Sequence, residues 1–126
     1  MRLARLDHLV LTVQDIEATC QFYTQVLGMG LITFGQNRKA LRFGQQKINL
    51  HLVGQEFEPK AQAPKPGSAD LCFLTETPLA DVIDHLEVHK IPIIEGPVQR
   101  TGTLGPILSV YIRDPDGNLL EIAYPM

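Results

Sequence analysis

The chain has 126 residues, a formal net charge of −3, 44% hydrophobic residues and 20% charged residues. This length predicts one domain, and this composition excludes a disordered chain, a collagen and a coiled coil. The negative charge argues against nucleic acid or an anionic membrane as a partner, and no apolar run approaches the roughly 18 residues that span a bilayer.

The first half of the chain reads as a strand, a helix and three further strands. Apolar positions recur with the helical period from Ile16 to Leu27, with Asp15 placed to cap the start of the helix and Gly28 its end. Runs rich in β-forming residues flank this helix and are separated by glycine-containing turns. The predicted strands are Leu6–Val13, Gly30–Phe34, Arg38–Phe43 and Lys47–Val53.

The second half repeats this order after a proline-rich loop over residues 55–67. Thr77 is placed as a helix N-cap with Pro78 as the first helical residue. Asp114–Gly117 is a strong tight-turn sequence between the last two strands. The predicted strands of this half are Asp70–Thr75, Ile91–Ile94, Ile107–Arg113 and Asn118–Tyr124.

The two halves align with one another. His8–Thr12 aligns with Asp70–Leu74, and the helix openers Asp15 and Thr77 then fall in register at the same offset. Such an internal repeat decides the architecture. We expect one α+β domain of two paired β-α-β-β-β modules, residues 1–54 and 68–126 with the linker 55–67, forming a curved mixed sheet around a cup-shaped site for a metal or ligand.

Four strands in equivalent places of the two repeats each carry a polar residue of a metal-ligating type. These residues are His8, Asn49 or His51, Asp70, and Glu121. Because a buried, unpaired carboxylate is costly, we expect a divalent cation to balance the charge. Histidine, carboxylate and amide ligands suit Ni, Zn, Fe or Mn without selecting among them. The alternative is that these are ordinary polar residues at strand ends.

Two long segments resemble the vicinal oxygen chelate superfamily, which contains glyoxalases, bleomycin-resistance proteins and extradiol dioxygenases. They are Leu6–Val13 with the helix end Phe22–Gly28, and Tyr111–Glu121. Three shorter segments resemble a branch of glyoxalase domain-containing proteins with virulence-associated bacterial members, namely Lys47–His51, Pro66–Phe73 and Gly96–Gly102. The resemblance covers the whole chain and implies a metal in a cup formed by the modules, with one ligand from each of four strands.

His8 matches the family's first-strand ligand, and Glu121 matches its last-strand ligand. The other two positions depart from the pattern. Asn49 stands where glyoxalase I has a glutamate, with His51 two residues further on the same face. Asp70 stands where relatives have a histidine, and is expected to ligate, to act as a base or to form an ion pair. Glu121 and Asp70 are the candidate proton-transfer residues, and Asn49 is a candidate substrate contact.

Tyr111 lies ten residues before Glu121, the spacing at which extradiol dioxygenases carry a substrate-positioning tyrosine; the alternative is an aromatic residue of the core. Residues 100–106 are rich in glycine. We expect them to form a loop that covers the cup and offers Arg100 and Thr101 to an anionic substrate, or else a plain connection.

Basic residues gather in the third strand and its neighbour. They are Arg38, Lys39, Arg42 and Lys47. A carboxylate-bearing ligand such as a glutathione adduct would suit this charge, and a solvated edge strand explains it equally well.

Three functions remain open. The first is a divalent-metal-dependent lyase or isomerase that resembles glyoxalase I and binds two vicinal oxygens of a small substrate. The second is an extradiol-type dioxygenase with Fe(II) or Mn(II) on His8, His51 and Glu121. The third is a non-catalytic small-molecule-binding protein, like the bleomycin-resistance proteins, which the departures at Asn49 and Asp70 favour.

The cellular setting is predicted from weaker signals. The N-terminal residues lack the apolar core of a signal peptide, so we expect a cytoplasmic protein. Cys20 and Cys72 lie in apolar contexts and are expected to be reduced core thiols. Unpaired sheet edges and the habit of the family predict a homodimer.

Overall fold

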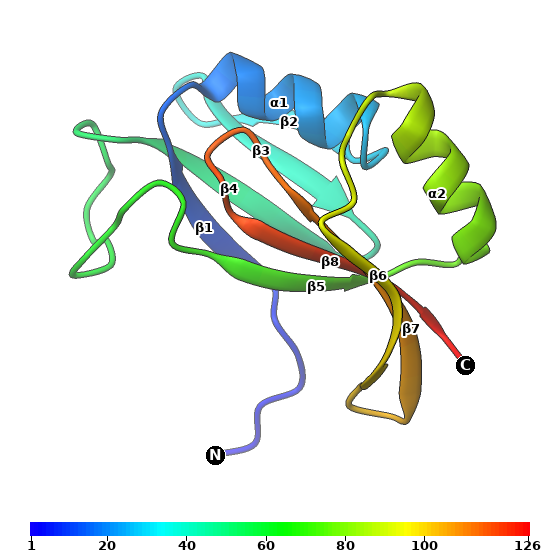
Figure 1. Cartoon of the computed structure of the whole chain (residues 1–126). Helices are drawn as coiled ribbons and strands as arrows, with labels where there is room; N and C mark the ends of the chain where they lie inside the picture. Colours follow the sequence, from blue (N-terminus) through cyan, green and yellow to red (C-terminus); the bar gives the residue numbers. More distant parts are fainter. The chain divides into compact units, whose positions relative to one another are not determined.

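The structure is a computed structural model that describes residues 1–126. It divides into two compact units, Met1–Pro66 and Gly67–Met126. Each unit contains one helix and one four-stranded mixed sheet, in the order β-α-β-β-β (Figure 1). The predicted α+β class and the internal repeat are therefore confirmed.

In the first unit the strand order is β1-β4-β3-β2, with β1 parallel to β4 and the other pairs antiparallel. The predicted bounds agree with the structure to within two residues for every strand. The elements are β1 His8–Val13, α1 Ile16–Gln25, β2 Gly30–Phe34, β3 Arg38–Phe43 and β4 Gln46–Leu52.

Helix α1 begins and ends where the sequence predicts. The Asp15 carboxylate accepts a hydrogen bond of 2.9 Å from the backbone N–H of Ala18, which satisfies one of the free donors of the first turn. Gly28 follows the helix with φ +71°, a conformation that favours glycine. The buried face of the helix carries Thr19, Cys20 and Tyr23. Its contacts are with β2, β3 and β4.

The second unit repeats the topology, with strand order β5-β8-β7-β6 and β5 parallel to β8. Its apolar sheet positions are fully or almost fully buried, and they alternate with more polar ones. These positions are Val110, Ile112, Leu120 and Ile122. The elements are β5 Asp70–Leu74, α2 Leu79–Val88, β6 Glu95–Thr101, β7 Pro106–Arg113 and β8 Leu119–Pro125.

One predicted strand is wrong. Residues 91–94 are not a strand, and β6 instead covers Glu95–Thr101, so Arg100 and Thr101 lie on a strand and not in a loop. The pairing of β6 with β7 shifts register between Glu95 and Val98. Gly96 lies in this irregular stretch with φ +103°, and a Cβ there would meet a backbone carbonyl of β7. An edge strand tolerates glycine and proline at such a bulge, although both residues read as loop signals in the sequence.

The predicted cap of α2 is also wrong. The helix starts at Leu79 with Pro78 in the N-cap position, and no side chain caps it. The backbone N–H of Thr77 bonds instead to the hydroxyl of Thr75 at 3.0 Å. Neither helix is long and apolar enough to cross a bilayer.

The turn between β7 and β8 is held by a buried carboxylate, as the tight-turn sequence predicts. Asp114 Oδ1 accepts from the backbone N–H groups of Asp116 and Asn118, both at 2.9 Å, and Oδ2 accepts from Asn118 Nδ2 at 2.8 Å. Asn118 Oδ1 in turn accepts from the N–H of Ala69 at 2.8 Å. This network ties the turn to the start of β5.

We expect Asp114→Ala to lower the free energy of unfolding by about 2–4 kcal/mol, because it leaves several buried donors without an acceptor. Denaturant titration measures the loss. Asp84→Ala, on the exposed side of α2, is the matched control and should change stability by less than about 0.5 kcal/mol. Equal, small effects of both substitutions would contradict this role for Asp114.

Candidate functional site

The polar face of the first sheet carries His8, Asn49 and His51, as predicted. Residues paired across strands form rows, and His8, Val10 and Thr12 of β1 pair with Lys47, Asn49 and His51 of β4. His8 and His51 are therefore two rows apart, about 13 Å along the strand direction. The structure does not bring these two histidines together, and no group of three or more His, Cys, Asp or Glu side chains converges as a metal site.

His8 is paired with its neighbour in the chain. Its Nδ1 lies 2.9 Å from Asp7 Oδ2, and 44% of the histidine side chain is exposed. This hydrogen bond lowers the pKa of Asp7, so the carboxylate is ionised and only accepts. His8 Nδ1 is then the donor to Asp7, and Nε2 takes no part in this hydrogen bond. A cavity of about 270 Å³ adjoins this pair; its lining is Asp7, Arg42, Gly44, Gln45, Gln46 and Lys47.

His51 contacts an arginine and a phenylalanine. It is only 4% exposed. Its Nε2 lies 3.5 Å from Arg38 Nη2, and its ring meets Phe57 edge-on with 5.5 Å between centroids. Burial, and then the charge of Arg38, lower the pKa of His51. His51 is thus a neutral partner of Arg38, a contact that the sequence did not predict.

The polar face of the second sheet carries Glu121. The register aligns Cys72, Glu121, Tyr111 and Glu95 in one row across β5, β8, β7 and β6. Asp70 is paired with Leu119, one row away, so it is a diagonal neighbour of Glu121 on the same face. The structure therefore brings together Glu121 and Tyr111 as predicted, with Asp70 beside them.

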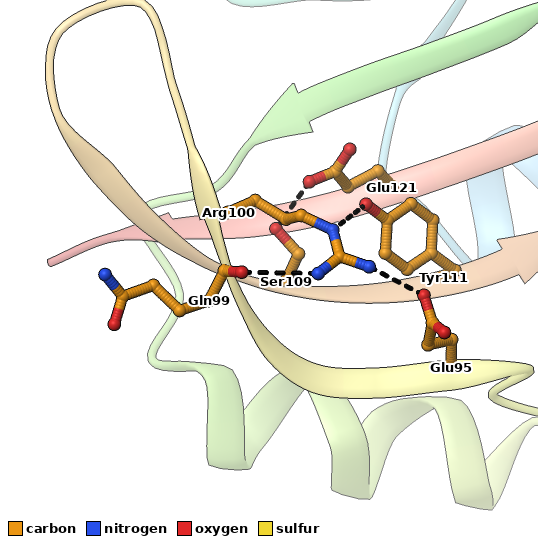
Figure 2. A network of polar contacts seen from close by, with 6 residues as sticks. All are labelled: Glu95, Gln99, Arg100, Ser109, Tyr111 and Glu121. Carbon is orange, nitrogen blue, oxygen red and sulfur yellow. Dashed lines mark hydrogen bonds and ion pairs between the residues drawn. The ribbon is translucent and has the colours of Figure 1, made fainter.

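Glu121 is held by two groups. Ser109 Oγ donates to Glu121 Oε2 at 2.5 Å (Figure 2). On the other side, the Cys72 thiol donates to the same carboxylate. Burial, followed by the charge and the hydrogen bond of Glu121, raises the pKa of Cys72 to about 11.

The prediction that both cysteines belong to the core is wrong for one of them. Cys20 lies on the buried face of α1, whereas Cys72 is exposed to solvent and its thiol is only partly desolvated. Cys72 lies on the outermost strand of the second sheet and on its polar face. Its apolar sequence neighbours alternate to the opposite face, which is why its context misled the prediction.

Arg100 joins the row through Tyr111. Arg100 Nε donates to the tyrosine hydroxyl at 3.0 Å, and Nη2 forms an ion pair with Glu95 at 2.8 Å (Figure 2). A third bond runs from Nη1 to the carbonyl of Gln99 at 3.3 Å. These contacts, first of all the bond to Tyr111, raise the pKa of Arg100. Thr101 pairs with Pro106 at the strand end and has no part in this network.

Sequence reasoning missed three members of these sites. Ser109 and Glu95 share the face of Tyr111, and strand alternation from Tyr111 could have found Ser109. Glu95 could not be found, because its strand was predicted one segment too early. Arg38 was noted only as one of several basic residues. Its contact with Phe57 joins two segments that no local pattern connects.

The two β-α-β-β-β units, each with one apolar and one polar sheet face, define a class of α+β proteins built from an internal repeat. A family model described as Glyoxalase/Bleomycin resistance protein/Dioxygenase superfamily matches residues 5–122, and the chain belongs to this superfamily. The predicted resemblance is thereby confirmed.

Several relatives are similar over most of this chain. Virulence protein STM3117 of Salmonella typhimurium is 62% identical over 98% of this chain and 85% of its own length. Its crystal structure matches all of this chain and of that chain with a TM-score of 0.98. Glyoxalase domain-containing protein RDO1 of Mycosarcoma maydis is 59% identical over 94% of this chain, which spans 66% of that protein.

A more distant relative is Biphenyl-2,3-diol 1,2-dioxygenase 2 of Rhodococcus globerulus, which is 31% identical over 94% of this chain. The chain spans 61% of that protein.

We expect the Cys72 thiol to be slow toward a disulfide reagent such as DTNB. With its pKa raised to about 11, little thiolate is present at pH 8. In a Cys20→Ala background, the rate should be at least tenfold below that of a free thiol, an order-of-magnitude figure. Glu121→Gln removes the neighbouring charge and should speed the reaction, whereas Glu87→Gln on α2 should not. A rate equal to that of a free thiol in the Cys20→Ala protein would contradict the contact of Cys72 with Glu121.

His51 should make stability depend on pH. Its pKa is lowered in the folded state, so the unfolded chain binds more protons at moderately acidic pH. This contribution is fully present above the unfolded pKa of about 6.5 and is lost as the pH falls toward the folded pKa. Thermal unfolding between pH 7.5 and 5.5 measures it. The fall in melting temperature between these pH values should be smaller in His51→Gln and unchanged in His89→Gln. An unchanged fall in His51→Gln would contradict this role for His51.

Proposed function

We propose that this protein is a divalent-metal-dependent lyase or isomerase that acts on a small molecule with vicinal oxygens. His8 and Glu121 are the proposed metal ligands. The observation that carries the proposal is the Asp7–His8 hydrogen bond of 2.9 Å, which engages Nδ1 and leaves Nε2 as the ring nitrogen that would bind a cation. A carboxylate behind a histidine is the usual support of a metal-binding imidazole.

The chemical types of the two proposed ligands are ones that such an ion prefers. Ser109 orients Glu121 through Oε2, in the way that ligating carboxylates are held by outer hydrogen bonds. An imidazole nitrogen and a carboxylate oxygen suit Ni, Zn, Fe or Mn. When bound, the cation would polarise the two oxygens of the substrate and stabilise the negative charge that develops on them.

The protein's own groups supply proton transfer. Glu121 is the proposed general base, and Asp70, one row away on the same face, is the second carboxylate within reach of that region. Because the Tyr111 hydroxyl accepts from Arg100 Nε, its own hydrogen is available to donate. Tyr111 is thus the proposed donor to an oxyanion, with the Arg100 charge behind it.

The dioxygenase alternative has weaker support. It draws on the relative named Biphenyl-2,3-diol 1,2-dioxygenase 2. The ligand set proposed for it needs His51 beside His8, but these residues lie two rows apart and His51 contacts Arg38. The binding-protein alternative is favoured by a separate group of residues around Arg38.

Metal affinity tests the proposal without an activity assay. Chelator-treated protein is titrated with Zn²⁺, Ni²⁺ and Mn²⁺ by calorimetry, and one equivalent of at least one ion should bind. Asp7→Asn removes the support of His8 and should weaken binding by roughly 10- to 100-fold. His8→Ala and Glu121→Ala should abolish it.

Asp81→Asn, an exposed acidic residue of α2, is the matched control and should bind like the parent protein. The proposal fails if the parent protein binds none of the ions, or if His8→Ala and Glu121→Ala bind as tightly as the control.

A further inference from the structure

Two cations of the first unit converge on one aromatic ring. The Arg38 guanidinium carbon lies 4.9 Å from the centre of the Phe34 ring, and Lys47 Nζ lies 4.3 Å from it. Neither cation has an ion-pair partner, because the ion pairs of the protein are formed by other basic residues. The Asp7 carboxylate, whose pKa the charge of Lys47 helps to lower, offsets part of the lysine's charge. The charge of Arg38 raises the local potential and favours binding of an anion.

The position of Arg38 in the sheet excludes a solvated edge strand as the reason for its basic side chain. A solvated edge strand would account for scattered basic residues, but β3 lies between β4 and β2 and is not an edge. Arg38 is only partly exposed, and its Nε is buried without any hydrogen-bond partner. A buried, unpaired donor on a charged group costs free energy unless a ligand satisfies it.

The aromatic contacts determine which part of the guanidinium is not covered by a ring. Its carbon lies 4.2 Å from the centre of the Phe57 ring and 4.9 Å from that of Phe34. Two rings therefore occupy the guanidinium's surroundings by cation–π contact, and recognition is left to its N–H edge. On that edge Nε has no partner, and Nη2 has only the long contact of 3.5 Å to neutral His51. This pair of N–H groups matches the spacing of two oxygens of a carboxylate or phosphate.

No acidic side chain forms an ion pair with this edge. Glu56, whose charge acts on His51, accepts from the N–H of Gly54 at 2.8 Å and lies 3.7 Å from Lys60. It is thus committed to its own loop. Asn49 is 93% buried on the same face, diagonal to Arg38, and its Oδ1 also lacks a partner. A ligand with an oxyanion and a nearby hydroxyl or amide donor would satisfy both residues.

We propose that Arg38, with Lys47 and Asn49, forms a binding site for an oxyanion, a carboxylate or phosphate group of a small ligand that also carries a hydrogen-bond donor. Arg38 binds two oxygens through Nε and Nη2, Lys47 adds a second positive charge, and Phe34 and Phe57 hold the guanidinium in place. The site lies within the first unit and requires no metal. It can therefore be tested independently of the proposed function.

Anion titration of metal-free protein tests the site. The Arg38 Nε–Hε resonance is followed by NMR while benzoate or inorganic phosphate is added at constant ionic strength. A saturable shift of this resonance is expected with at least one of the two anions, and the anion that binds more tightly identifies the group. This measurement on the parent protein does not depend on any substitution.

Substitutions then distinguish recognition by the paired N–H donors of Arg38 from attraction by positive charge in general. Arg38→Lys keeps the charge but removes the paired donors, and should weaken binding at least about tenfold. Lys47→Met should weaken it less, about threefold to tenfold. Arg42→Gln removes a charge from the same face, four residues further along β3, and should stay within about twofold. The proposal is overturned by the absence of a saturable shift with both anions, by unchanged binding in Arg38→Lys, or by equal losses in Arg38→Lys and Arg42→Gln.

Discussion

Each unit depends on the parallel pairing of its first strand with its last. Parallel neighbours cannot be joined by a tight turn, so the chain must pass through a helix and two further strands before it returns. Once this register is set, the period of two fixes every side chain to one face. Leu11 and Ile48 go to the apolar face, and His8 and Asn49 go to the opposite one. The polar groups of both sites therefore follow from strand pairing.

Equivalent positions of the two repeats carry side chains of different chemistry. The row of Asn49 in the first sheet corresponds to the row of Glu121 in the second, because each is paired with the third residue of its unit's first strand, Val10 and Cys72. In the second sheet the carboxylate is held by Ser109. In the first sheet the equivalent position is an amide, and the neighbouring charges are cations. One backbone plan thus supports a carboxylate centre in one unit and a cationic centre in the other.

The sequence was sufficient where a local pattern determines structure. Helix α1 follows from the spacing of its apolar residues and from Asp15, and the β7–β8 turn follows from Asp114–Gly117. Strand alternation correctly placed His8 and Asn49 on the polar faces of their strands and Glu121 opposite Leu120 and Ile122. These features depend on interactions within a few residues or on a strict period.

Elsewhere the decisive contact lies far away in the sequence. Strand β6 contains Gly96 and Pro97, which favour a loop, and is a strand because β7 offers it a hydrogen-bonding edge. His51 was a candidate metal ligand from its residue type, yet Phe57 and Arg38 determine its surroundings. Phe57 lies in the proline-rich segment after β4, and no periodicity relates it to Arg38.

Asn49 has a physical consequence for the charges around it. A glutamate at this position, as in the equivalent row of the second sheet, would be a diagonal neighbour of Arg38 and within reach of its guanidinium. It would serve as an internal counterion and occupy the donor edge. The amide has no charge, so Arg38 has no ion-pair partner, and its buried Nε lacks an acceptor. The replacement of a carboxylate by an amide thus removes a charged group suited to binding a cation and leaves the same face suited to binding an anion.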